Sequence, residues 1–182
     1  MTHTSERLVL LYSRDQIARR VGELAAVISA DYAGADLVLV GILRGSFVFL
    51  ADLIRQLTIP AVIDFVGAAS YGSRTQTSGQ VIFTRELQVP VSGRDLLLVE
   101  DIEDTGLTLQ AIQKKLKELG PRSVKVCTLI DKRERRQIDV PVDYVGFEID
   151  KGFIVGYGID YAEQYRYLPD IYRIEGLAKP DE

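Results

Sequence analysis

Strand-length aliphatic runs alternate with segments of helical periodicity, and this alternation restricts the folds open to the chain. The run LVLVGIL at 37–43 is apolar throughout, and residues 47–57 then repeat apolar side chains with helical spacing. The same order recurs at 94–102, 107–119 and 123–130. Fully apolar strands are typical of parallel sheets covered by helices on both faces. We therefore predict an α/β fold, with a mostly parallel twisted sheet flanked by helices.

Two of the predicted helices have clear boundary signals. Ser13 and Gln16 are spaced as a capping box at the start of a helical segment that ends near Tyr32. A second helix follows Gly106, and Gly120 is its stop signal. The apolar face of this second helix consists of Leu109, Ile112, Leu116 and Leu119.

Size and composition indicate one soluble domain. With 182 residues and 47% hydrophobic content, the chain can bury one core, so we expect residues 1–182 to form a single domain. The single cysteine, Cys127, lies in an apolar run and cannot form an internal disulfide, which fits a reducing cytoplasm. No apolar span is long enough to cross a bilayer, so we expect a cytoplasmic protein without a membrane partner. The net charge of −4 argues against nucleic acid as a partner.

The stretch LLLVEDIEDTGLT places four carboxylates within residues 100–104, between a predicted strand and a predicted helix. Ligands of parallel sheets gather at the carboxyl ends of the strands. The amides around Gly106 and the start of the helix are suited to hold a phosphate. The Walker and dinucleotide-binding patterns are both absent from the sequence. We therefore predict a phosphate site of another kind.

Carboxylates do not bind phosphate, so the acidic residues indicate a second role. They can accept hydrogen bonds from a pair of hydroxyls, hold a divalent cation, or remove a proton, and a sugar phosphate offers all three opportunities. The alternative is that they are solvated acids at a strand end. Mutual repulsion and the phosphate-shaped turn beside them argue against that alternative.

VEDIEDTGLT resembles the phosphoribosyl pyrophosphate motif of type I phosphoribosyltransferases, and most closely that of the hypoxanthine-guanine branch. Three further segments are similar to parts of that branch, in family order. GILRGSFVFLADL resembles the pyrophosphate loop, SYG the start of the flexible catalytic loop, and VGFEIDKGFIVGYGIDYAEQYR the purine-binding hood. Together the four segments span most of residues 37–166.

The resemblance implies a type I phosphoribosyltransferase fold with a small hood subdomain, formed mainly by about residues 142–182 and by N-terminal residues. It implies a purine salvage enzyme whose substrates are phosphoribosyl pyrophosphate and a 6-oxopurine base. The phosphoribosyl group would pass to N9 of hypoxanthine or guanine, giving IMP or GMP and pyrophosphate. The implied cofactor is Mg²⁺, and the implied assembly is a homodimer or homotetramer.

The resemblance also assigns roles within the acidic motif. Asp104 matches the general base that takes the proton from purine N7. Glu100 and Asp101 match the acidic pair at the ribose hydroxyls and their magnesium, and Asp160 matches a ligand of a second magnesium. The loop that holds the 5'-phosphate is matched by Thr105, Gly106, Leu107 and Thr108.

Other matches concern pyrophosphate and the flexible loop. Arg44 and Gly45 match the pair whose peptide bond, often cis in this family, contacts pyrophosphate, and Arg166 matches an arginine facing it. Ser70 and Tyr71 begin the flexible loop. Arg44 departs from the lysine usual in the family and brings a broader, planar set of donors.

The purine would be held by three residues. Lys132 matches the lysine that donates to O6, Phe153 the aromatic stacked on the base, and Ile154 the residue whose backbone faces C2. Without the resemblance, Lys132 would be read as part of a solvated loop and Phe153 as core. Asp160 and Arg166 would likewise be read as a surface ion pair.

One further departure lies in the acidic motif. Glu103 replaces an aliphatic residue, and it is expected either to point into solvent or to alter the proton affinity of Asp104.

Three alternatives to this function remain. One is a xanthine-preferring relative, because xanthine differs from the other bases at C2. A second is a non-catalytic regulator of the same fold that senses nucleotides and binds RNA, favoured only by the basic run at 132–136. A third is an inactive scaffold protein of the same fold.

Overall fold

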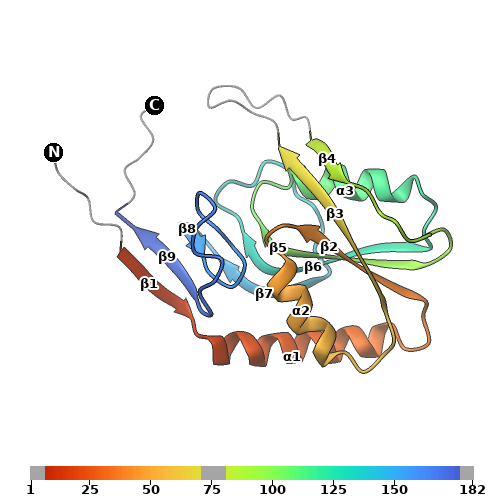
Figure 1. Cartoon of the computed structure of the whole chain (residues 1–182), viewed down its shortest axis with the longest axis horizontal. Coiled ribbons are helices and arrows are strands. Elements are labelled where there is room, and N and C mark those ends of the chain that lie inside the picture. Colours follow the sequence, from red (N-terminus) through yellow and green to blue (C-terminus); the bar gives the residue numbers. More distant parts are fainter. Residues whose placement is uncertain (1–6, 71–80, 177–182) are drawn as a thin grey trace.

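Two sheets of unequal size organise the computed structural model, which describes residues 7–70 and 81–176 (Figure 1). The larger sheet has the strand order β4-β3-β2-β5-β6-β7, and the smaller has the order β1-β9-β8. The strands of the larger sheet are β2 (Leu37–Leu43), β3 (Val62–Ser70), β4 (Val81–Arg85), β5 (Asp95–Glu103), β6 (Ser123–Lys132) and β7 (Tyr144–Ile149). Those of the smaller sheet are β1 (Arg7–Tyr12), β8 (Phe153–Val155) and β9 (Ile171–Glu175). The helices are α1 (Arg14–Asp31), α2 (Phe47–Gln56) and α3 (Leu107–Lys117).

The larger sheet confirms the predicted α/β fold. Strand β2 pairs in parallel with β3 and β5, β5 with β6, and β6 with β7. Among the described strands of this sheet, only the edge strand β4 runs antiparallel to its neighbour, β3. The carboxyl ends of β2, β5 and β6 therefore lie at the same edge of the sheet, where ligands of such folds gather.

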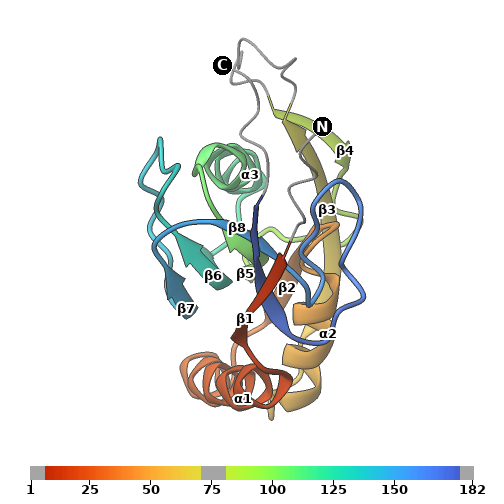
Figure 2. The ribbon, with the colours of Figure 1, turned by 90° about the vertical axis from the view of Figure 1, so that its left-hand side faces the viewer.

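Helices cover both faces of the larger sheet, which explains why its central strands are apolar throughout. Leu39 of β2 and Leu97 of β5 pack in the core that includes α1 and α2. Val40 and Leu98, one residue further along each strand, pack in the core that includes α3. Figure 2 shows α1 and α3 on opposite sides of the sheet. Alternate side chains thus serve two separate cores.

The capping box predicted for the first helix is confirmed. Ser13 Oγ accepts from the Gln16 amide at 3.3 Å, and Gln16 Oε1 accepts from the Ser13 amide at 2.9 Å. These two bonds satisfy amides that a helix start otherwise leaves without a partner. Both lie at the junction of β1 and α1.

Replacing Ser13 by alanine is expected to lower the free energy of unfolding by about 1 kcal/mol, because the side-chain cap is lost. For a domain of this size that corresponds to a fall in melting temperature of roughly 2–4 °C. Calorimetry of the variant measures it, with Ser13→Thr as a control that keeps a hydroxyl. A Ser13→Ala protein that melts at the wild-type temperature would show that the cap contributes nothing.

One prediction for α3 is wrong. Leu109, Ile112 and Leu116 are buried as expected, but Leu119 is 46% exposed. The helix ends at Lys117, and Gly120 adopts a φ of 72°, so the chain turns away before Leu119 can continue the apolar face.

The smaller sheet contains two strands that the sequence pattern does not predict. Strand β1 pairs antiparallel with β9, and β9 pairs antiparallel with β8, so N-terminal and C-terminal segments meet in one sheet. The stacked rings of Tyr12 and Phe147, with centroids 3.9 Å apart, link the end of β1 to β7 of the larger sheet. In the described part of the chain, no helix combines the length and apolarity needed to cross a membrane.

Candidate active site

The acidic turn connects β5 to α3 at the carboxyl edge of the larger sheet. Gly106 directly precedes α3 and has a φ of 85°, in the left-handed region that favours glycine. A Cβ atom at this position would overlap the backbone carbonyl of Ile138. The turn therefore requires glycine for its conformation and for its close packing.

The segment at 136–138 braces the turn from outside. The Thr105 carbonyl accepts from the amides of Gln137 at 3.0 Å and Ile138 at 3.1 Å. Inside the turn, the Leu107 amide donates to Thr105 Oγ1 at 3.4 Å. The turn is thus held in place from the segment after β6, and its residues join the start of a helix, an arrangement that favours an anion.

The paired acids Glu100 and Asp101 are held in a desolvated environment. Glu100 Oε2 is buried and has no hydrogen-bond partner in the part of the chain that the structure describes. Burial, together with the charges of Asp101 and Glu103, raises the pKa of Glu100 well above its usual value. Burial also raises the pKa of Asp101 to about 6, although backbone amides and the charge of Arg166 lower it. Both carboxylates therefore favour a ligand that brings positive charge or hydroxyl donors.

Glu103 does not point into solvent, so that alternative is wrong. The residue is 4% exposed, and burial raises its pKa to about 7 while the charge of Arg136 lowers it. Strand β5 extends as far as Glu103, and buried and partly buried side chains alternate at its end. Glu103 is at one of the buried positions, like Asp101 two residues earlier.

Asp104 and Lys132 meet across the carboxyl ends of β5 and β6. Lys132 Nζ lies 3.4 Å from Asp104 Oδ1 and 3.5 Å from Glu134 Oε2. Arg135 Nη1 lies 3.6 Å from Asp104 Oδ2. Lys132 is the last residue of β6 and only 4% exposed, so its interpretation as a solvated loop residue is wrong.

Gly45 packs directly against Asp101. A Cβ atom at position 45 would overlap the Asp101 carboxylate, and one at Gly158 would overlap the Gly45 carbonyl. Gly158 has a φ of 98°. Three segments remote in sequence therefore approach through glycine backbone at one point.

The cis peptide bond lies one residue earlier than predicted. It joins Leu43 to Arg44, whereas the prediction placed it between Arg44 and Gly45. Cis bonds are almost confined to proline, so no residue type marks which bond of a non-proline pair adopts this form. The Arg44 side chain extends to Glu163, with which it forms an ion pair.

Asp160 and Arg166 form a partly buried pair beside this glycine contact. Arg166 Nη2 lies 2.5 Å from Asp160 Oδ1, and Nη1 donates to the Gly158 carbonyl at 2.7 Å. Their side chains are 26% and 21% exposed. The charges of both residues act on Asp101, so the pair belongs to the acidic site and is not an isolated surface pair.

The two hood residues differ in exposure. Phe153 is 47% exposed and meets Tyr161 edge to face, with ring centroids 5.8 Å apart, so its assignment to the core is wrong. Ile154 is 5% exposed, and its backbone pairs with Arg173 of β9. Ser70 ends β3, whereas Tyr71 lies outside the described residues.

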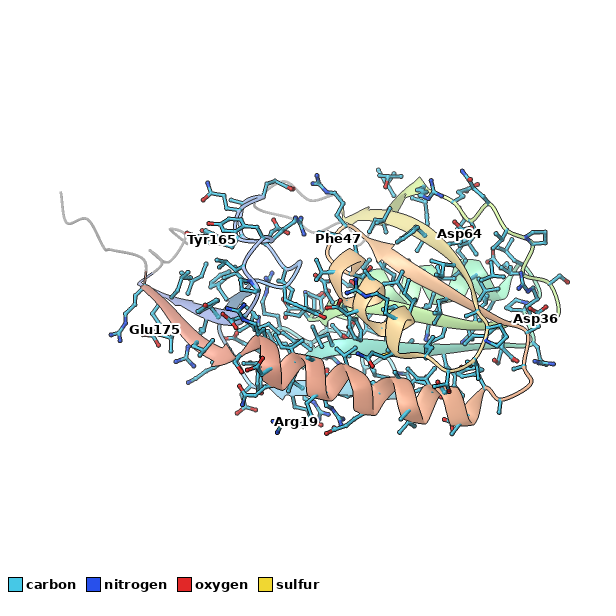
Figure 3. The ribbon with its side chains drawn as sticks, turned by 60° about the horizontal axis from the view of Figure 1, so that its bottom comes forward. Arg19, Asp36, Phe47, Asp64, Tyr165 and Glu175 are labelled. Carbon is cyan, nitrogen blue, oxygen red and sulfur yellow. The ribbon has the colours of Figure 1, made fainter. Side chains whose placement is uncertain are left out.

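A cavity of about 700 Å³ adjoins the site on the side of Arg166. It is bounded by the first turns of α1 and α2 and by the chain between Tyr157 and Pro169. Phe47 and Tyr167 line it and are 46% and 82% exposed. Figure 3 shows Phe47 and Tyr165 on the side of the molecule away from Arg19 of α1.

The structure brings the predicted site residues together in two neighbouring groups. The first consists of the acidic turn and Lys132, which contacts Asp104. The second consists of Gly45, Asp160 and Arg166, which lie around Asp101 of the acidic motif. Sequence reasoning missed Arg136 and Glu163, which contact these groups, and Asp131, which contacts Arg136. The run KRERR was the available signal for Arg136, but nothing in its spacing separates a buried arginine from two exposed ones.

Comparisons with known proteins show what the chain is similar to. Residues 11–162 match the model of the phosphoribosyl transferase domain. The hypoxanthine phosphoribosyltransferase of Salmonella typhimurium is 44% identical over 176 residues, covering 96% of this chain and 97% of the relative. The hypoxanthine-guanine phosphoribosyltransferase of Bacillus subtilis is 39% identical over 180 residues, covering 99% and 97%. A crystal structure of a Staphylococcus aureus hypoxanthine phosphoribosyltransferase superposes with a TM-score of 0.88 at 39% identity, covering 92% of this chain and 91% of that one.

Proposed function

This chain belongs to the phosphoribosyltransferase family, and from that premise we propose that it is a purine salvage enzyme of the hypoxanthine-guanine type. It transfers the 5-phosphoribosyl group of phosphoribosyl pyrophosphate to N9 of hypoxanthine or guanine, yielding IMP or GMP and pyrophosphate. The observation that carries this assignment is the 3.4 Å approach of Lys132 Nζ to Asp104 Oδ1, beside a turn suited to phosphate.

The purine site follows from that approach. In a 6-oxopurine, O6 and N7 lie next to each other on one edge of the ring. Lys132 donates to O6, while Asp104 takes the N7 proton as N9 forms its bond to the ribose. Phe153 offers an exposed ring on which the base stacks. Adenine has an amino group at C6, which is a donor and so does not accept from Lys132.

The sugar phosphate occupies the acidic turn. The amides and hydroxyls of Thr105 through Thr108 hold the 5'-phosphate at the start of α3. Glu100 and Asp101 accept from the ribose hydroxyls, which would give the partnerless Glu100 Oε2 a donor. The role of Glu100 is supported by its burial and by the absence of a protein partner for Oε2 among the described residues.

Pyrophosphate leaves on the opposite side, against Arg44, Gly45 and Arg166. The anomeric carbon becomes cationic as its bond to pyrophosphate breaks. The negative charge of the departing pyrophosphate therefore needs neutralisation, and water must be excluded. Arg44 and Arg166 supply fixed positive charge, and both are paired with Glu163 in the free protein. Gly45 lies directly against the Asp101 carboxylate, a close approach that is possible because glycine has no side chain.

Mg²⁺ fits the donor set as an ion that enters with its substrate. Among residues 7–70 and 81–176, no group of three histidine, cysteine or acidic side chains forms a metal cage. Magnesium in proteins usually takes one or two carboxylates, with waters and substrate phosphates completing its shell. Glu100 and Asp101 would hold the magnesium at the ribose hydroxyls, and Asp160, whose charge acts on Asp101 in the free protein, would hold a second magnesium. When bound, magnesium neutralises charge on pyrophosphate.

We expect hypoxanthine and guanine to be converted to nucleotide, and adenine and uracil to give no product. Initial rates with phosphoribosyl pyrophosphate, Mg²⁺ and each base at equal concentration measure this. Xanthine is included because C2 contacts come from the backbone of Ile154. A folded protein that converts no base would contradict the assignment, and preference for xanthine would replace it with the xanthine-preferring alternative.

Further aspects of the assignment follow from the same premise. The smaller sheet, with the segment after β8, acts as the hood over the purine. The protein works in the cytoplasm, without nucleic acid, as a homodimer or homotetramer. Exposed Phe47 and Tyr167 beside the adjoining cavity support self-association. Sedimentation equilibrium measures the assembly, and a monomer at micromolar concentration would contradict it.

A further inference from the structure

Arg136 connects the acidic turn to the end of β6. Its Nε donates to the Asp104 carbonyl at 3.1 Å. Its Nη2 donates to the carbonyls of Glu103 at 3.2 Å and Lys132 at 3.1 Å. The side chain is only 14% exposed. A single planar guanidinium therefore bonds to the backbone of both residues whose side chains meet at the proposed purine site.

Two buried carboxylates orient this guanidinium. Asp131 Oδ1 accepts from Nη2 at 2.5 Å, and Glu103 Oε1 lies 3.8 Å from Nε. The side chains of these acids are 6% and 5% exposed. Glu103 Oε1 has no hydrogen-bond partner within residues 7–70 and 81–176, so it acts on Arg136 through charge. Asp131 fixes the orientation of the guanidinium, and both acids offset its charge.

The neighbouring arginines lack this arrangement. Arg133 and Arg135 have side chains that are 71% and 61% exposed. Arg133 also reaches Asp131, at 3.4 Å, yet the described hydrogen bonds include none from it to a backbone carbonyl. Arg133 is therefore a matched control for the positive charge of residues 132–136, because it contacts Asp131 as Arg136 does but lacks the bonds to backbone carbonyls among the described residues.

Starting from the proposed phosphoribosyl transfer, we propose that Arg136 is a positioning residue that sets the approach of Lys132 to Asp104. It acts through the backbone and does not touch the substrate. Strand β6 ends at Lys132, and Asp104 directly follows the end of β5, so the approach of the two side chains depends on how the strand ends are held relative to each other. Misplacement of a reacting group by about 1 Å can lower a rate by roughly 10²-fold.

Arg136→Lys separates charge from geometry, because lysine keeps the positive charge but not the planar set of donors. We expect kcat with hypoxanthine to fall by about 10- to 100-fold and KM for hypoxanthine to rise. KM for phosphoribosyl pyrophosphate should stay within about threefold, because the amides of Gln137 and Ile138 still hold Thr105 of the phosphate turn. Arg133→Lys should behave as wild type. Thermal melts establish that the proteins compared are folded.

Wild-type kcat in folded Arg136→Lys would overturn the positioning role, as would an equal loss in Arg133→Lys. If Arg136→Lys does not fold, Asp131→Asn takes its place, because it removes the charged acceptor that orients Arg136. The same fall in kcat, with KM for phosphoribosyl pyrophosphate nearly unchanged, is then expected. Failure of both variants to fold would make Arg136 purely structural and overturn the proposal. An inactive, folded wild-type protein would contradict the phosphoribosyl transfer itself, and with it this role.

Discussion

Replacing Asp104 by asparagine is expected to slow nucleotide formation by about 10²- to 10⁴-fold, the contribution of a positioned general base. Asparagine has nearly the same shape, but its amide cannot take the N7 proton. It also removes the negative charge that faces Lys132 Nζ at 3.4 Å, so KM for the base should change as well. KM for phosphoribosyl pyrophosphate should change little, because Asp104 does not hold phosphate.

Single-turnover rates are the measurement, because product release can hide a slower chemical step in kcat. Asp36→Asn is the matched control. Asp36 lies just before β2, and Figure 3 shows it at the end of the molecule remote from Tyr165. It pairs there with Arg94, and its side chain is 66% exposed. Full single-turnover rate in Asp104→Asn would remove Asp104 from the chemistry.

Gly106→Ala is expected to weaken binding of phosphoribosyl pyrophosphate and to destabilise the protein together. The left-handed conformation at φ 85° costs an L residue about 1–2 kcal/mol. The new Cβ would overlap the Ile138 carbonyl, so the segment that donates to Thr105 must also move. We expect KM for phosphoribosyl pyrophosphate to rise by at least about 10-fold, since one lost binding interaction of about 1.4 kcal/mol has that effect.

The control for this change is Gly22→Ala. Gly22 lies inside α1 with open space around its Cα, so alanine there should stabilise the helix by up to about 1 kcal/mol. Both substitutions add the same methyl group, and only the local geometry differs. Kinetics and melting curves of the two variants make the comparison. Wild-type KM and stability in Gly106→Ala would show that the turn tolerates a side chain.

The strands and helices of the larger sheet were predictable because their signal is local. Leu39 and Val40 are both apolar since helices cover both faces of the sheet, and Leu109, Ile112 and Leu116 recur with the period of a helix. Strands β1 and β9 escaped prediction because each is short and is stabilised by pairing with a partner far away in the chain. Periodicity carries no information about such a partner.

The acids of the turn were predictable for a related reason, since they lie close together in the sequence. The environment of these acids in the folded protein was not predictable. Glu103 could be read as solvated because only the folded chain brings Arg136 and Asp131 to it. Lys132 and Phe153 were misjudged in opposite directions when read without the family resemblance, one being buried and the other exposed. Burial at a site depends on distant segments, which the local pattern does not encode.

The contact between Gly45, Asp101 and Gly158 has a consequence for protein synthesis. Gly45 and Asp101 leave the ribosome well before Gly158, yet the pyrophosphate side of the proposed site needs all three segments. Contacts between such remote residues form late, after their loops have closed. A nascent or truncated chain that ends before Gly158 therefore carries the acidic turn without the surface for the leaving group. We therefore expect such an incomplete chain to form no nucleotide, because the proposed pyrophosphate side of its site is missing.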